Sequence, residues 1–386
     1  MKQMHKLKEY IERLNRQNSD LVYGIDDVCG ITNTKKLMTG TRANLNGRTF
    51  EAFTILNPNE FIFNRRTSRN GEKISLGFNT MSKSCILTED YCHFRIKKEK
   101  ENELSSEYLY LFFLNSEFDR YVRFNSWGSA TEFFNWDDMC DTPIKLPSLE
   151  EQQMIVKEYN CFIQEEQLLL KKEKYLKEIA SNIYKEFFVY FKHEPLIESS
   201  IGMIPVTWKV GKLTDIMTYA GGQQPPASEF ISKPKEDYVR LIQIRDYETD
   251  EYVTYIPVSK KNKLCNESDI MLARYGDVGR VCFGLNGAYN VAMAKVTPLK
   301  PCYTEYLRCY LDSDSFFQSI NEGSERSVIN GFNSDNIDSI NIPIAPDDYY
   351  EKFEKLAAPI FQHRLNIKKQ LSIIRDIEKK YLNVKF

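Results

Sequence analysis

The sequence lacks the cysteine and histidine spacing of a metal site or a disulfide framework. Its nine cysteines are scattered singly, without a C-x-x-C pair. None of the four histidines lies beside a cysteine or carboxylate in a ligand pattern: His5, His93, His193 and His363. This distribution predicts reduced thiols in a cytoplasmic protein that binds no metal.

Membrane and catalytic signatures are also missing. No apolar run is long enough to span a bilayer, and the opening MKQMHKLKEYIERLNRQN lacks the apolar core of a signal peptide. The chain has no G-x-x-x-x-G-K-[ST], H-E-x-x-H or G-x-S-x-G motif, and Asn57-Pro58 does not continue as the N-P-P-[YF] of amino-methyltransferases. We therefore expect no catalytic residue, although a nuclease built from dispersed Asp, Glu and Lys stays open.

One short sequence pattern occurs twice in the chain. Its 386 residues are a length that suits two domains. IKLPSLEEQQMIV (144–156) and INIPIAPDDYYEKF (340–353) both pass from alternating apolar residues through proline into an acidic segment. Ser148 and Glu151 have the spacing of a capping box, and Asp348 and Glu351 repeat it. The repeat predicts two helix starts.

A seven-residue apolar line follows each predicted start and indicates two long helices that pair. The lines consist of Ile155, Phe162, Leu169, Leu176 and Ile183, and of Phe353, Ile360, Ile367, Ile374 and Tyr381. In an antiparallel pair, Glu166 and Glu173 would lie near His363 and Gln370 as a polar layer; a solvated edge is the alternative. Pro359 is expected to kink or restart the second helix.

The repeat extends beyond the helices. EYL (107–109) recurs at 305–307, and FNWDDM (134–139) recurs as FNSDNI (332–337). EFIFNR (60–65) and DIMLAR (269–274) each indicate a buried strand followed by an arginine. We predict an α/β fold with a pseudo-two-fold internal repeat, in which each half is a globular domain followed by a long helix. Two related but distinct binding surfaces suit such an arrangement.

Polar and basic residues on expected loops favour DNA as the ligand, although the net charge of −2 decides nothing. Arginine can bind guanine, glutamine or asparagine can bind adenine, and lysine can bind phosphate. For any single residue, an ordinary solvated surface position is the alternative. The candidates are Arg42, Arg65, Arg66, Ser68, Arg69, Asn70, Lys73 and Lys83 in the first half, and Gln223, Gln224, Arg245, Lys260, Lys261, Arg274, Tyr275 and Arg280 in the second.

Several of these segments together resemble the specificity (S) subunits of Type I restriction–modification systems. The resemblance covers nearly the whole chain, through IKLPSLEEQQMIV, YLKEIASNIYKEFFVYF (175–191), IGMIPVTWKVGKLTDI (201–216), NEFIFNRRTSRNG (59–71), SDIMLARYGDVG (268–279) and FEKLAAPIFQHR (353–364). It implies two α/β target recognition domains, 1–146 and 193–346. They would be joined by two long antiparallel, coiled-coil-like helices, 147–192 and 347–386.

The resemblance also implies a function and partners. Each recognition domain would read half of a split site in double-stranded DNA. The helices would set the spacer and dock two methyltransferase (modification) subunits, which recruit restriction/translocase subunits. S-adenosylmethionine, ATP and Mg would act in those partners, with no cofactor in this chain. Residues 65, 66 and 68–70 fall in the first recognition loop by motif, and residues 274–276 in the second. The first domain lacks the G-x-I-P-x-x-W entry that Gly202–Trp208 provides in the second.

Two alternatives belong to other functional classes. The chain could be a nuclease or a fragment of a fused methylase–endonuclease, which would turn over without partners. It could instead be a protein scaffold whose globular halves do not read DNA. A steep salt dependence of DNA affinity would argue against the scaffold.

Overall fold

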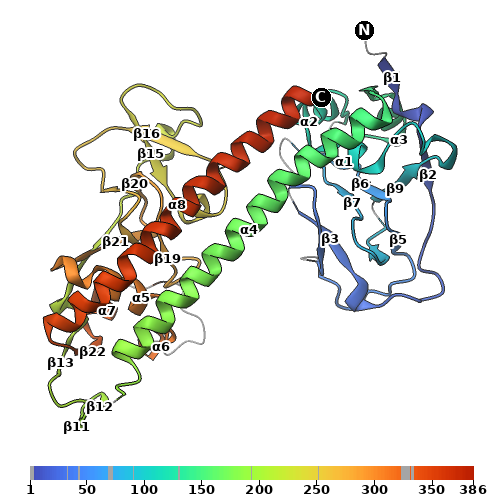
Figure 1. The fold of residues 1–386 in the computed structure, drawn as a ribbon. Helices are drawn as coiled ribbons and strands as arrows, with labels where there is room; N and C mark the ends of the chain where they lie inside the picture. Colours follow the sequence, from blue (N-terminus) through green and yellow to red (C-terminus); the bar gives the residue numbers. More distant parts are fainter. Residues whose placement is uncertain are drawn as a thin grey trace. The chain divides into compact units, whose positions relative to one another are not determined.

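The computed structural model describes residues 4–32, 34–41, 44–67, 73–89, 91–128, 131–192, 194–250, 252–322, 331 and 334–386. The chain forms two compact units: unit 1 is Met1–Glu166 with Ile373–Phe386, and unit 2 is Gln167–Ser372. Both long helices, α4 (Leu149–Phe188) and α8 (Asp347–Lys385), contribute to each unit (Figure 1). Within the described ranges, no helix combines the length and apolar character needed to cross a membrane.

The core of unit 1 lies between a four-stranded antiparallel sheet and short helices (Figure 1). The sheet order is β2 (Ile11–Leu14), β9 (Tyr91–Ile96), β6 (Phe61–Asn64) and β7 (Leu76–Phe78). The helices are α1 (Ser106–Leu114), α2 (Ser116–Phe124) and α3 (Trp136–Asp141). Smaller antiparallel pairs are β1 (Met4–Lys6) with β10 (Pro143–Lys145), β3 (Cys29–Ile31) with β4 (Leu37–Thr39), and β5 (Thr54–Leu56) with β8 (Cys85–Leu87). Three consecutive apolar residues of β6, Phe61, Ile62 and Phe63, are fully buried, as in a central strand that is covered on both faces.

Unit 2 has the same kind of core between a four-stranded sheet and helices, and a smaller apolar cluster joins that sheet to a second four-stranded sheet. The first has the order β14 (Met217–Gly221), β21 (Met293–Pro298), β18 (Ile270–Ala273), β19 (Val281–Cys282). The second has the order β16 (Thr254–Pro257), β15 (Tyr238–Ile242), β20 (Gly287–Tyr289), β17 (Leu264–Cys265), with β15 and β20 parallel. The remaining elements are β11 (Leu196–Ser199) with β12 (Gly202–Pro205), β13 (Lys209–Lys212) with β22 (Asn341–Ile344), α5 (Thr304–Leu311), α6 (Asp314–Glu322) and α7 (Ser334–Asp338).

The internal repeat predicted from the sequence is confirmed by this topology. The order β2-β9-β6-β7 in unit 1 corresponds strand for strand to β14-β21-β18-β19 in unit 2, and both sheets are antiparallel. The two segments predicted as buried strands, EFIFNR and DIMLAR, form the third strand of each order, β6 and β18. The mixed α/β class follows from the sheets and their covering helices.

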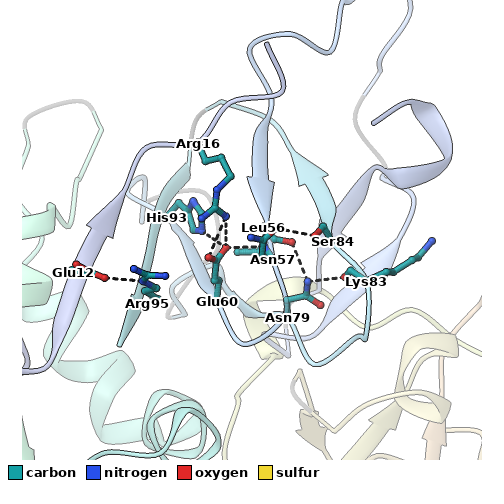
Figure 2. A network of polar contacts seen from close by, with 10 residues as sticks. All are labelled: Glu12, Arg16, Leu56, Asn57, Glu60, Asn79, Lys83, Ser84, His93 and Arg95. Atoms are coloured by element: carbon teal, nitrogen blue, oxygen red, sulfur yellow. Dashed lines mark hydrogen bonds and ion pairs between the residues drawn. The ribbon is translucent and has the colours of Figure 1, made fainter. Parts of the chain in front are cut away.

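The repeat extends to one polar contact. Glu60 and Asp269 each precede the third strand, and each contacts a basic residue on the neighbouring strand: Glu60 lies 2.7 Å from His93 Nε2, and Lys295 Nζ lies 2.6 Å from Asp269. His93 and Lys295 occupy the same register position in β9 and β21. Figure 2 shows the unit 1 version, in which Arg16 also donates to Glu60 at 2.9 Å. The pair therefore fixes the start of each third strand.

The predicted helix starts had different outcomes. The box at the start of α4 is confirmed: Ser148 Oγ accepts from the Glu151 amide at 3.2 Å, and Glu151 accepts from the Ser148 amide at 3.1 Å. The second box is wrong, because α8 begins at Asp347 and Asp348 therefore lies in its first turn. There Asp348 accepts from Lys352 at 2.9 Å, as an ordinary i,i+4 pair does.

The two long helices pair antiparallel within each unit. In unit 1, Tyr381 donates from its hydroxyl to the carbonyl of Ile155 at 3.3 Å, and its ring centroid is 5.4 Å from that of Phe162. In unit 2, the ring of Phe353 lies 5.8 Å from that of Phe187. The residue numbers thus fall along α8 as they rise along α4, as the two heptad lines predict.

The polar layer between the helices has other partners than the sequence indicated. Glu173 accepts from Arg364 at 2.8 Å in unit 2, and Glu166 accepts from Arg375 at 2.7 Å in unit 1. His363 and Gln370 are exposed. The prediction that they would face the glutamates is wrong, because the long arginine side chains reach the seam from flanking positions.

Pro359 neither ends nor restarts α8, which runs without interruption from Asp347 to Lys385. The proline leaves the carbonyl of Lys355 without its helical donor. Both residues are exposed, so water can hydrate that carbonyl and the cost of the missing bond stays small.

Candidate nucleic-acid interface

In both units an arginine follows the third strand of the four-stranded sheet. Arg65 follows β6 in the segment that leads to β7, and Arg274 follows β18 in the segment that leads to β19. Arg65 is exposed and Arg274 is half-buried. The same sheet position therefore presents a guanidinium twice, where it can donate two hydrogen bonds to a guanine edge or a phosphate.

In the described part of the segment that follows β6, the guanidinium groups of the arginines are available to a ligand. Among the described residues, no hydrogen bond or ion pair engages the guanidinium of Arg65 or Arg66. Lys73 is half-buried, near the carboxylate of Asp119. Four other candidates lie outside the described residues: Arg42, Ser68, Arg69 and Asn70.

Lys83 lies apart from this segment, in the turn between β7 and β8. Its carbonyl accepts from the Asn79 side chain at 3.1 Å, and its own side chain is exposed and points away from the Glu60 network (Figure 2). Its backbone is therefore held firmly, while its ammonium is solvated. No contact of a described residue joins Lys83 to Arg65.

Arg274 is oriented by two tyrosine rings in unit 2. Its guanidinium carbon lies 6.0 Å from the ring centroid of Tyr219 and 5.4 Å from that of Tyr275. Burial raises the pKa of Tyr219 to about 12 while the arginine charge opposes the rise, so the phenol stays neutral at physiological pH. A Cβ at Gly221 would lie 2.6 Å from Arg274 Nη1, so a larger residue there would displace the end of the arginine side chain from its present position. Cation–π contacts thus hold the arginine in one orientation.

Gln223 and Gln224 lie at the same end of the unit 2 sheet as Arg274. The amide of Gly222 donates to the carbonyl of Met293 at 3.0 Å, and the amide of Arg274 donates to the carbonyl of Ala292 at 2.8 Å. Both glutamine side chains are exposed. The structure therefore places two exposed glutamines and one arginine, whose side chains can read adenine and guanine, at the same end of one sheet.

The other unit 2 candidates are less uniform. Arg280 donates to Glu248 at 2.8 Å and lies 3.4 Å from Asp277, so two carboxylates offset its charge. Arg245 is exposed, in the 3₁₀ turn η6 (Ile244–Tyr247). Lys260 and Lys261 are exposed in the loop between β16 and β17. These lysines suit phosphate contacts rather than base reading.

All ten apolar residues proposed for helix pairing are buried or half-buried. Ile155, Leu169, Phe353 and Ile367 are buried, whereas Phe162, Leu176, Ile183, Ile360, Ile374 and Tyr381 are half-buried. α8 also buries Phe361 and Leu365, which pack against Phe283 of the globular part of unit 2. A second apolar stripe therefore faces the domain, and the heptad line alone did not indicate it.

Sequence reasoning did not single out one exposed aromatic residue near the first arginine segment. Trp127 is 73% exposed, and its backbone joins the segment that pairs with Arg66. Its position before Gly128, between a helix and a turn, was the available signal. A tryptophan in such a loop has no periodic pattern to identify it.

Comparisons with known proteins agree with this arrangement. The model of a family described as "Type I restriction modification DNA specificity domain" matches residues 21–178 and 205–369. The chain is 24% identical over 332 residues to the Type I restriction enzyme MjaIX specificity subunit of Methanocaldococcus jannaschii, covering 82% of this chain and 76% of that protein. It is 27% identical over 188 residues to the MjaVIII specificity subunit of the same organism, covering 46% of this chain and 43% of that protein.

Among the solved structures that are similar in fold is the Type-I restriction-modification system S subunit from M. genitalium. The TM-score is 0.52 at 12% identity, over 99% of this chain and 95% of that chain. At that identity the likeness shows the fold alone.

Proposed function

Because the chain belongs to the family of Type I restriction modification DNA specificity domains, we propose that it is the sequence-specific DNA-binding subunit of a Type I restriction–modification complex. Each unit reads one half of a bipartite site in double-stranded DNA. The observation that carries this proposal is the duplicated arginine, Arg65 after β6 and Arg274 after β18, at one position of a repeated sheet. The family match does not favour the nuclease, fused-fragment or scaffold alternatives.

We further propose that the residues named above divide the task. Arg65, Arg66, Arg274 and the glutamine pair at 223–224 contact base edges, because they offer the forked or amide groups that base edges match. The lysines contact phosphates and position the protein. Ser68, Arg69 and Asn70 join the first loop by the family motif alone.

The chain itself is proposed to carry no catalytic residue and no cofactor. Two methyltransferase subunits, with S-adenosylmethionine, dock on the helices, and restriction subunits add ATP- and Mg-dependent cleavage. The unit 2 part of α4 supports a docking role, because Leu168, Tyr175 and Ile179 lie on one helical face and are 60%, 51% and 47% exposed. An apolar stripe of this kind suits a partner helix. The cytoplasm is the compartment that this function requires.

A salt titration of DNA affinity tests the proposal. The full chain, with its methyltransferase subunits, is titrated with a labelled duplex at several salt concentrations, and a linear fall of log K with log salt is expected from phosphate contacts. Arg65→Ala and Arg274→Ala should each cost about 1–3 kcal/mol and relax the preference at one half-site only. Lys83→Ala is the matched control for base reading: it removes an exposed cation proposed to contact phosphate, so it should weaken binding to all sequences alike and leave the preference at both half-sites unchanged.

The result that would overturn the proposal is equally concrete. A complex that binds all duplexes equally at moderate salt, or does not bind them, would return the chain to the scaffold alternative. Turnover by the chain alone, with Mg or S-adenosylmethionine, would favour an enzyme.

A further inference from the structure

Three short backbone segments of unit 1 form a narrow ribbon beside the first arginine segment. Trp127 and Phe133 exchange two backbone hydrogen bonds, at 3.1 and 3.0 Å. Phe133 also forms an antiparallel bridge with Arg66, and the amide of Phe134 donates to the carbonyl of Arg65 at 2.8 Å. The segment around Phe133 is therefore the centre of the ribbon, with the arginines on one side and Trp127 on the other.

Directly paired residues of antiparallel strands present their side chains on the same face. Arg66, Phe133 and Trp127 consequently form one row, which we name the Arg66–Phe133–Trp127 row. Arg66 and Phe133 are half-buried, whereas Trp127 is 73% exposed. The row thus ends in a large aromatic side chain held out from a hydrogen-bonded backbone.

The turn after Trp127 depends on glycine. Gly128 has a φ of +152°, and a Cβ built there would lie 1.9 Å from the carbonyl oxygen of Thr131. No other residue fits without moving this backbone. The orientation of Trp127 is therefore set by the ribbon and its turn.

The exposure of Trp127 differs from that of the other two tryptophans. Trp208 is 6% exposed in the core of unit 2, and Trp136 is half-buried, with its ring centroid 5.7 Å from that of Phe94. An exposed indole forgoes the free energy that burial would provide, but single exposed apolar side chains are common, so the case for Trp127 rests on its place in the row beside the arginines. Phe124, at the end of α2, is 81% exposed as well.

The local charge selects the kind of partner. Elsewhere in unit 1, Arg16, Arg48 and Arg95 each contact a carboxylate. Among the described residues, no carboxylate lies within ion-pair distance of Arg65 or Arg66. Two such arginines beside an exposed indole suit a polyanion that carries flat rings, which is a nucleic acid rather than a protein surface.

We propose that the Arg66–Phe133–Trp127 row is a DNA contact in which the indole of Trp127 stacks on a nucleobase and Arg66 binds the adjacent phosphate. Apolar side chains inserted at a base step, and aromatic rings stacked on exposed bases, are established ways of binding nucleic acid. The inference rests on the proposed function and adds an aromatic contact to the arginines of the first half-site. Trp127 acts by stacking, so it strengthens binding without adding to the salt dependence.

Fluorescence and affinity together test this contact. The full chain, with its methyltransferase subunits present, is titrated with a 30-base-pair duplex of mixed sequence. Its tryptophan fluorescence is compared with that of a Trp127→Phe variant titrated in the same way. Quenching present in the wild type and absent from the variant is expected. Trp127→Ala should weaken binding roughly 5- to 150-fold, as the loss of one base stack does. Phe124→Ala, an equally exposed aromatic outside the row, is the matched control and should leave affinity unchanged.

The salt dependence separates the roles within the row. Trp127→Ala should keep the wild-type slope of log K against log salt, whereas Arg66→Ala should reduce that slope by about one, as the loss of one phosphate contact does. A shallower slope for Trp127→Ala would show that the substitution disturbs the arginines instead, which would overturn the stacking role.

The outcomes also distinguish this inference from the proposed function. If the DNA affinity of the wild type falls steeply with salt but Trp127→Ala binds DNA as tightly as the wild type does, the inference fails and the proposed function stands. If Trp127→Ala leaves DNA affinity unchanged yet loses the methyltransferase subunits, the row is a protein contact and the inference is wrong. If the wild type does not bind DNA, the proposed function itself fails.

Discussion

Replacing Glu60 by glutamine is expected to destabilise unit 1 at neutral pH. The Glu60 side chain is 6% exposed, and its carboxylate lies 2.7 Å from His93 Nε2, accepts from Arg16 at 2.9 Å and accepts from the Asn57 amide at 2.7 Å (Figure 2). Burial alone would raise the pKa of Glu60, but these hydrogen bonds outweigh it and lower the pKa from 4.5 to about 2. That lowering corresponds to about 3 kcal/mol of stability at neutral pH.

The pH dependence of this contribution has a definite sign. Because the folded pKa of Glu60 lies below the unfolded value, the stabilisation is complete above about pH 5 and is lost as pH falls toward 2. Wild-type unit 1 should therefore lose stability over this window more steeply than Glu60→Gln does. Glutamine does not titrate, so the two proteins should converge at low pH.

Hydrogen–deuterium exchange in increasing urea provides the assay, because peptides from each unit report its own opening. Peptides of β6 and β9 should exchange at lower urea in Glu60→Gln, while unit 2 peptides serve as an internal reference. Glu12→Gln is the matched control: the Glu12–Arg95 pair in the same sheet has side chains 38% and 31% exposed, and such pairs contribute roughly 0–1 kcal/mol. Equal stability of Glu60→Gln and wild type at pH 7 would refute the reasoning.

Three further substitutions or insertions test other features. Asp119→Ala should destabilise unit 1 by about 3–5 kcal/mol in thermal unfolding, because it leaves the buried Lys35 ammonium, 2.7 Å away, without its carboxylate; Lys35→Met should recover part of the loss. Gly222→Ala should cost about 1–3 kcal/mol in urea, because its Cβ would lie 2.2 Å from a carbonyl oxygen, whereas Gly24→Ala, with no described heavy atom within 4 Å, should be neutral. Inserting one heptad within Lys171–Lys174 of α4, with a matching heptad in α8, should change the length of the DNA spacer between the two half-sites but the sequence of neither half-site. Methylome sequencing measures this spacer, and an unchanged spacer length would contradict the prediction.

The sequence predicted the elements that depend on local pattern. The capping box at Ser148 and the buried strands ending before Arg65 and Arg274 follow from spacing and alternation, which act over a few residues. The antiparallel helix pair follows from two seven-residue lines of similar length. The family match agrees with the resemblance that these motifs carry.

Long-range partner choice was not predictable. The partners of Glu60 are 33 and 44 positions away in sequence, and nothing in the local pattern selects His93 or Arg16. Arg364 contacts Glu173, where the sequence had indicated His363. Because α8 packs on two sides, a single heptad line does not identify every residue that faces α4. The base-reading residues stay a prediction, since single loop residues have no period and part of the first loop lies outside the described residues.

Unit 1 is completed by Ile373–Phe386, which contains the C-terminal turns of α8. The ring of Phe386 lies 5.0 Å from that of Tyr108, and Leu382 is 6% exposed in the same core. During translation this segment leaves the ribosome only after all of unit 2. The half that is synthesised first therefore cannot close its core until unit 2 has been synthesised, while unit 2, encoded between the two segments of unit 1, can fold before that point.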